Sequence, residues 1–123
     1  MSGPDSRVAA ASSGAPVQAG VPWRDGEVDE LAETFRVLAD PGRLRVILAL
    51  METPEMHVGG LAEAAGLSET ACSHALRLLR TAHVVKRRKV GRSVLYSLDD
   101  DHVSGLLGLA RDHVEHARAG HRS

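Results

Sequence analysis

The chain has 123 residues, of which 43% are hydrophobic and 2% aromatic, and its formal net charge is −1. This length supports one domain with a modest core, and no apolar run approaches the roughly 18 residues that a membrane span requires. The N-terminus lacks the pattern of a secretory signal, and the single cysteine, Cys72, excludes an internal disulfide. We therefore expect a cytoplasmic protein.

The small net charge conceals an uneven distribution. Between Glu69 and Tyr96 there are seven basic residues and one acidic residue, whereas the remainder has eight basic and fifteen acidic residues. Such a basic segment is typical of a surface that binds a polyanion.

The first part of the chain predicts a tail followed by two helices. Residues 1–22 are rich in Ala, Ser, Gly and Pro without a period, which is typical of a flexible tail. A first helix is expected after Trp23 and the acidic residues up to Glu30. The spacing of its apolar residues predicts a buried face made by Leu31, Phe35 and Leu38.

Asp40 and Pro41 predict the start of the second helix, since aspartate is a preferred N-cap and proline fits the first helical position. The residues from Glu52 to Pro54 end this helix. The positions that its spacing predicts to be buried are Leu44, Ile47, Leu48 and Met51.

The next stretch predicts a helix-turn-helix. A short helix from Val58 stops at Gly66, and a longer helix follows the N-cap candidate Ser68 and ends near Ala82. A short helix, a tight turn and a longer helix with polar exposed residues form this motif. The residues of the longer helix expected to face solvent are Thr70, Ser73, His74, Arg77 and Arg80.

A β-hairpin is predicted next. Val84 and Val85 begin one strand, Val90–Arg92 forms the tip, and Ser93–Leu98 returns with alternating apolar residues. A hairpin directly after a helix-turn-helix is the wing of a winged helix. We therefore expect a mainly α fold with a β-hairpin wing (α+β) over residues 23–118, followed by a C-terminal tail at 119–123.

The longer helix and the wing together predict DNA binding. Hydroxyl, imidazole and guanidinium groups on the helix can contact base edges or phosphates, and the basic wing residues would bind the phosphate backbone. An ordinary solvated surface is the alternative for the helix alone, but it leaves the basic wing unexplained. The predicted DNA-binding residues are Ser73, His74, Arg77, Arg80, Lys86, Arg87, Arg88, Lys89 and Arg92.

The last helical stretch carries four candidate metal ligands: Asp100, His102, His113 and His116. His102 and His113 are 11 residues apart, which places them on nearly the same helix face but about 16 Å apart along the axis. Because zinc–nitrogen bonds are only about 2 Å long, one helix cannot surround one ion with all four groups. Two antiparallel copies can, and this predicts two equivalent metal sites across a symmetric dimer formed by the terminal helices.

A carboxylate and three imidazoles suit tetrahedral Zn(II) or Co(II), whereas Ni(II) favours more ligands. His121 is the one further donor nearby, and we expect it to be a free tail residue. The alternative is a helix with scattered exposed histidines, of which His113 and His116 would interact favourably with the helix dipole.

Cys72 has two interpretations. In an exposed, electropositive helix it would be a redox-sensitive thiol, which would make oxidation the signal that a winged-helix repressor senses. We favour a small side chain that packs against the neighbouring helix.

These residues resemble the ArsR/SmtB winged-helix metal-sensing repressors over about two thirds of the chain. The matching segments are FRVLADPGRLRVILAL, LAEAAGLSETACSHALRLLRTAHVVKRRKVGRSVLYSL, and DDHV followed by HVEH. The resemblance implies a homodimer in which Asp100 and His102 of one protomer pair with His113 and His116 of the other. It also implies that the metal-free dimer binds operator DNA and that metal releases it, which derepresses metal efflux genes.

The resemblance further implies a link from His113 to the backbone of His83, at the end of the recognition helix. The cysteine pair that other members carry before the helix-turn-helix is missing, because MHVGGL stands there. The N-terminal tail has no histidine, unlike nickel sensors with extra terminal ligands, so Zn(II) or Co(II) is favoured over Ni(II). An enzyme is disfavoured, since a metallohydrolase pattern such as H-E-x-x-H is absent from the sequence. A dimeric interaction module that binds no nucleic acid leaves the basic wing unexplained.

Overall fold

The computed structural model describes residues 20–122, with the side chains of residues 20–120. Most of the predicted flexible tail at 1–22 therefore lies outside the described residues. By its internal contacts the chain divides into residues 1–32 and 33–123, with the boundary inside helix α2 (Glu27–Leu38). The unit 33–123 contains every candidate site residue.

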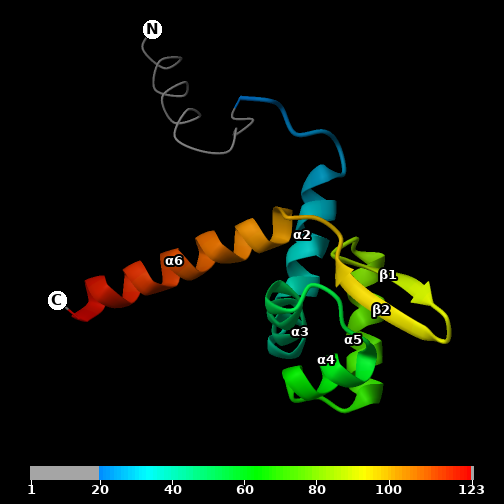
Figure 1. Ribbon diagram of the computed structural model, residues 1–123. Helices are drawn as coiled ribbons and strands as arrows, with labels where there is room; N and C mark the ends of the chain where they lie inside the picture. Colours follow the sequence, from blue (N-terminus) through cyan, green and yellow to red (C-terminus); the bar gives the residue numbers. More distant parts are fainter. Residues whose placement is uncertain (1–19, 123) are drawn as a thin grey trace, which may run out of the picture. The chain divides into compact units, whose positions relative to one another are not determined.

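Helices and a single hairpin follow one another in the order that the sequence predicts (Figure 1). The hairpin comes directly after the helix-turn-helix, so the expected winged-helix class is confirmed. The last helix continues to Arg122, into the segment 119–123 that we assign to a C-terminal tail. The remaining elements are α3 (Pro41–Glu52), α4 (Val58–Ala65), α5 (Glu69–Thr81), β1 (Val85–Val90), β2 (Ser93–Leu98) and α6 (His102–Arg122).

Local capping explains where the helices begin. The Asp40 carboxylate accepts a hydrogen bond from the Arg43 N–H at 3.0 Å, and Pro41 occupies the first turn of α3. Ser68 caps α5 in the same way, since its hydroxyl accepts from the Ala71 N–H at 3.0 Å. The turn between α4 and α5 is short because Gly66 adopts the left-handed conformation, with φ at +69°.

The core lies among α3, α4, α5 and the base of the hairpin. Aliphatic side chains of these three helices are fully buried, and Val84 and Val85 close the core where β1 begins. Close packing of small aliphatic residues is what a chain with so few aromatic residues requires. The largest fully buried side chains are Ile47, Leu61, Leu76, Leu79, Val46 and Cys72.

Two predicted core faces are only partly buried. On α2, Leu38 is buried as expected, whereas Leu31 and Phe35 are exposed. On α3, Leu48 and Met51 are exposed although their spacing predicted burial. The physical reason is that α3 turns the stripe of Val46, Ile47 and Leu50 inward, so that Ile47 is buried as predicted while Leu48 and Met51 lie outside this stripe.

The hairpin is held at both ends. Its register pairs Val85 with Leu98 and Val90 with Ser93, and the two-residue turn between the strands has Gly91 at a φ of +60°. A bridge joins Met56 to Tyr96: each backbone N–H donates to the other carbonyl, at 3.1 Å from Met56 and 2.8 Å from Tyr96. The loop between α3 and α4 therefore extends the sheet beside β2.

Candidate nucleic-acid interface and metal centre

Helix α5 presents the polar face that the sequence predicts. Ser73, His74 and Arg77 are exposed, while the other side of the helix is buried in the core. Arg80 is half-buried rather than fully exposed. The three exposed side chains provide hydroxyl, imidazole and guanidinium donors on one helix surface, which is the chemistry that contacts bases in a major groove.

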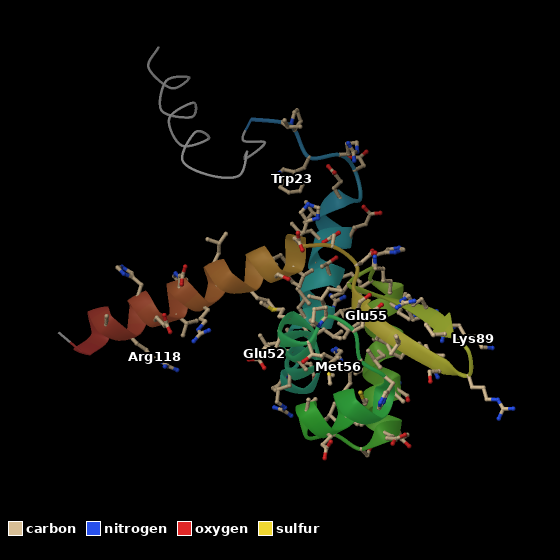
Figure 2. The ribbon with its side chains drawn as sticks, viewed as in Figure 1. Trp23, Glu52, Glu55, Met56, Lys89 and Arg118 are labelled. Atoms are coloured by element: carbon tan, nitrogen blue, oxygen red, sulfur yellow. The ribbon has the colours of Figure 1, made fainter. Side chains whose placement is uncertain are left out.

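The wing carries exposed basic side chains on both faces of the hairpin. Lys86 and Lys89 are exposed and form no ion pair within the described part of the chain, and the same holds for Arg87 and Arg92. Figure 2 shows Lys89 close to the end of the hairpin. These four cations form an electropositive surface suited to phosphates.

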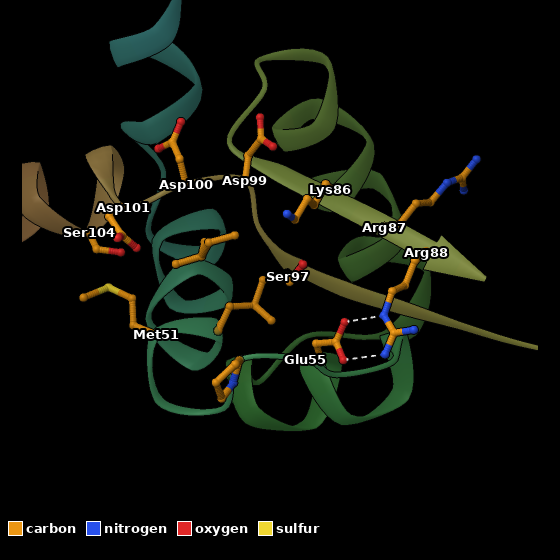
Figure 3. Close-up of a pocket in the computed structure, with 13 residues that line it drawn as sticks. Met51, Glu55, Lys86, Arg87, Arg88, Ser97, Asp99, Asp100, Asp101 and Ser104 are labelled. Carbon is orange, nitrogen blue, oxygen red and sulfur yellow. Dashed lines mark hydrogen bonds and ion pairs between the residues drawn. The ribbon is translucent and has the colours of Figure 1, made fainter. Parts of the chain in front are cut away.

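Arg88 differs from the other wing cations because it forms a bidentate ion pair with Glu55. Its Nε donates to Oε2 of Glu55 at 2.6 Å and its Nη2 donates to Oε1 at 2.9 Å (Figure 3). This hydrogen bonding lowers the pKa of the Glu55 carboxyl and raises that of the Arg88 guanidinium. Sequence reasoning missed Glu55, because the two residues are 33 positions apart and no sequence signal links them.

Asp100 and His102 form one half of the predicted metal site. Asp100 Oδ1 accepts a hydrogen bond from the His102 N–H at 2.8 Å, and its Oδ2 lies 3.2 Å from His102 Nδ1. The backbone N–H of His102, followed by its imidazole, lowers the pKa of the Asp100 carboxyl, which favours the ionised form that binds metals. Without a metal, Asp100 still satisfies a free N–H in the first turn of α6.

The histidines of α6 share one face with two exposed leucines. At about 100° per residue, the five positions fall within an arc of roughly 80°. Leu109 is 71% exposed and Leu106 36% exposed, whereas Val103 and Leu107, on the adjacent face, pack against the core. The residues on the exposed face are His102, Leu106, Leu109, His113 and His116.

A single chain does not assemble the four predicted ligands. Within residues 20–120, no three His, Cys, Asp or Glu side chains are grouped so that they could hold a metal ion. The structure brings Asp100 to His102, but leaves His113 and His116 about three helical turns away on the same helix. The side chain of His121 lies outside the described ones.

The end of the recognition helix is joined by hydrogen bonds to the segment that carries Asp100. His83 adopts a left-handed conformation with φ at +61°, and its N–H donates to the Arg80 carbonyl at 2.9 Å. The adjacent Val84 accepts a hydrogen bond from the N–H of Asp99 at 2.9 Å. Val84 in turn donates its N–H to the Leu79 carbonyl at 2.8 Å, so Asp99, which directly precedes Asp100, is linked to α5 through Val84 and two hydrogen bonds.

Cys72 is fully buried in the core. Burial raises the pKa of its thiol, and the nearby Glu69 adds to this effect. A buried thiol that stays protonated is a poor nucleophile, so the structure confirms the packing role.

Comparison with known proteins identifies the family. Residues 40–87, from the N-cap of α3 into β1, match the model described as "Bacterial regulatory protein, arsR family". The chain is also 47% identical over 89 residues to a transcriptional repressor SmtB homolog of Synechocystis sp., covering 72% of this chain and 67% of that relative. This chain belongs to the ArsR family.

Two further relatives agree with this assignment to the ArsR family. The HTH-type transcriptional regulator NmtR of Mycobacterium tuberculosis is 43% identical over 91 residues, which covers 74% of this chain and 75% of NmtR. A homodimeric winged helix-turn-helix DNA-binding domain of Mycobacterium bovis, described as a possible ArsR-family regulator, superposes with a TM-score of 0.67 at 28% identity over 80% of this chain and 95% of that one. Since ArsR-family members are transcription regulators, the chain is a regulatory protein and not an enzyme.

In the described residues, no helix has the length and hydrophobicity to cross a membrane.

Proposed function

We propose that this ArsR-family chain is a metal-responsive transcriptional repressor. The metal-free homodimer binds operator DNA through α5 and the wing. Zn(II) or Co(II), with Ni(II) as the third candidate, binds at two equivalent sites between the C-terminal helices, and the dimer then releases DNA and derepresses genes for metal efflux. The observation that carries the proposal is that His102, Leu109 and His113 share one exposed face of α6.

The donor set supports a metal of this class. Asp100 and His102 already place an oxygen and a nitrogen 3.2 Å apart at an exposed position, where the side chain of His102 is 92% exposed. His113 and His116 are three residues apart and lie next to each other on the helix surface. Each pair supplies two ligands, so two pairs from two protomers supply the four that tetrahedral zinc requires. A bound ion would tie the two C-terminal helices to each other.

The exposed apolar residues support a second copy of this chain as the partner. Leu106 and Leu109 lie between the two ligand pairs on α6, so burying them against the partner helix would bring the pairs together. A groove of about 380 Å³ between α3 and α6 is lined mainly by apolar residues, including Leu48, Met51 and Val114. Exposed apolar surface of this kind marks association sites.

The contacts at the end of α5 suggest how metal and DNA would oppose each other. Asp99 joins the Asp100 segment to Val84, and His83 is the residue whose backbone we expect His113 to reach. Metal would thus fix the separation of the two recognition helices, which must otherwise match half-sites about 34 Å apart. By linkage, operator DNA must weaken metal binding by the same factor, with a coupling of about 1–3 kcal/mol.

The test is a fluorescence anisotropy titration of labelled promoter DNA with and without each metal ion. We expect Zn(II) or Co(II) to release DNA from the wild-type protein, and His102→Ala and His113→Ala to bind DNA but ignore metal. His74→Ala serves as a control that weakens DNA binding without loss of metal binding. Variants at His102 and His113 that respond normally would remove the ligand assignment, and a wild-type chain without affinity for duplex DNA at low salt would remove the whole function.

The rival signal, oxidation at Cys72, predicts the opposite pattern. Peroxide would then release DNA, zinc would not, and Cys72→Ser would abolish the response. Burial of Cys72 weighs against this alternative, because an oxidant cannot reach the sulfur without local opening of the core.

A further inference from the structure

We infer that Glu55 removes Arg88 from the phosphate-binding surface of the wing and uses it to hold the wing against the loop between α3 and α4. Arg88 is then a positioning residue, and the remaining wing cations supply the electrostatic attraction to DNA. This inference rests on the proposed DNA binding, and it revises the prediction that all five basic wing residues bind DNA.

The geometry of the pair shows that Glu55 engages the Arg88 guanidinium. Both oxygens of Glu55 are engaged, by Nε and Nη2 of Arg88, at 2.6 and 2.9 Å. Arginine and a carboxylate in this parallel arrangement form charge-assisted hydrogen bonds, which are stronger than neutral ones and fix the geometry of the pair. The pair has no net charge, so its approach to a phosphate releases no counterion from the DNA. The approach of a free lysine does release one.

The alternation of side chains along β1 separates Arg88 from its neighbours. Successive residues of a strand point to opposite faces, so Arg88 shares a face with Lys86 and lies opposite to Arg87 and Lys89. Val85 and Tyr96 contact the core. Because Tyr96 pairs with Arg87 in the register, Arg87 and Lys89 belong to the core side of the hairpin and Arg88 to the other side. Figure 3 shows Arg87 pointing away from the Glu55–Arg88 pair.

Two backbone hydrogen bonds attach the loop to β2 independently of the Glu55 side chain. Met56 follows Glu55 and bridges to Tyr96 through both of its polar backbone groups. When the Glu55 charge is removed, these bonds still attach the loop to β2. A Glu55→Gln substitution therefore changes the charge of the pair while the wing keeps its backbone attachment.

The experiment measures the salt dependence of binding to a labelled duplex of mixed sequence, using the metal-free full chain. Each phosphate contact contributes about 0.9 to the slope of log K against log salt, which is about a 3.5-fold change in affinity over a fourfold range of salt. We expect Lys89→Gln to reduce the slope by this amount and Arg88→Gln to leave it unchanged. Glu55→Gln should increase the slope by up to the same amount, because it frees the Arg88 charge.

A charge-swapped protein with Glu55→Arg and Arg88→Glu is the control for wing attachment. It keeps the ion pair and the net charge, so it should retain the wild-type slope and the wild-type thermal midpoint. The inference is overturned if Arg88→Gln lowers the slope as much as Lys89→Gln while both proteins stay folded. If the wild-type chain shows no salt-dependent binding at all, it is the proposed function that fails.

Discussion

Ile47 and Leu48 are neighbours on α3 with opposite surroundings: Ile47 is completely buried in the core, and Leu48 is 49% exposed beside the groove between α3 and α6. The sequence predicted burial for both. Ile47 stabilises the fold of one protomer, whereas we expect Leu48 to contact the partner protomer.

Ile47→Ala should destabilise each protomer, whereas Leu48→Ala should weaken association. Truncating a fully buried isoleucine leaves a cavity and costs about 2–5 kcal/mol of folding free energy. Urea unfolding should show this loss for Ile47→Ala. For Leu48→Ala, sedimentation should show a shift toward monomer at low concentration, and equal effects of the two substitutions on association would contradict the assignment.

Leu109→Glu should prevent dimer formation, because it places a charge at the centre of the exposed apolar face of α6. Metal affinity should fall with it, since each proposed site then has only one of its two ligand pairs. Arg118→Glu is the matched control, because Arg118 lies on the far side of the same helix, about 180° from Leu109. Analytical ultracentrifugation and a zinc titration read both effects, and a dimeric Leu109→Glu protein with full zinc affinity would contradict the intersubunit site.

Ser68→Ala should cost about 1 kcal/mol, because the hydroxyl caps the recognition helix at the Ala71 N–H. Ser68→Asp should retain the stability of the wild type, since aspartate caps equally well and its charge favours the helix N-terminus. Chemical denaturation of the three proteins measures the difference. A Ser68→Ala protein as stable as the wild type would show that the cap contributes nothing measurable.

The Glu55–Arg88 pair should stabilise the fold only above acidic pH. The pKa of Glu55 is lower in the folded state than its ordinary value of 4.5. The contribution is therefore fully present above about pH 4.5 and is lost as the pH falls through the folded-state pKa. The stability difference between the wild type and Glu55→Gln, measured by thermal unfolding at a series of pH values, should shrink in that range. A difference that stays constant down to the lowest pH would exclude the ion pair as its cause.

Cys72 should resist thiol reagents in the native protein. The side chain is fully buried and its thiol is kept protonated, so maleimide labelling should require opening of the core. Labelling should become fast once denaturant unfolds the chain. Rapid labelling under native conditions would reopen the redox interpretation.

Local sequence patterns were enough to predict the order of the elements and where most of them begin. Asp40, Ser68 and Gly66 act through hydrogen bonds and dihedral angles of their own neighbourhood, so a local pattern was enough to place α3, α5 and the turn. The same holds for the hairpin with Gly91 at its turn. Candidate ligands could be listed because helical spacing is periodic.

Contacts between distant parts of the chain, in contrast, fix which apolar face is turned inward and which charges are paired. Leu48 and Ile47 both fit an apolar stripe in the sequence, but only Ile47 is buried in the core that α3 forms with α4 and α5. Arg88 is indistinguishable from Arg87 in the sequence, but the bridge between Met56 and Tyr96 brings Glu55 to one of them. Such contacts join residues far apart in the chain, and their energies depend on burial and distance, which no local pattern contains.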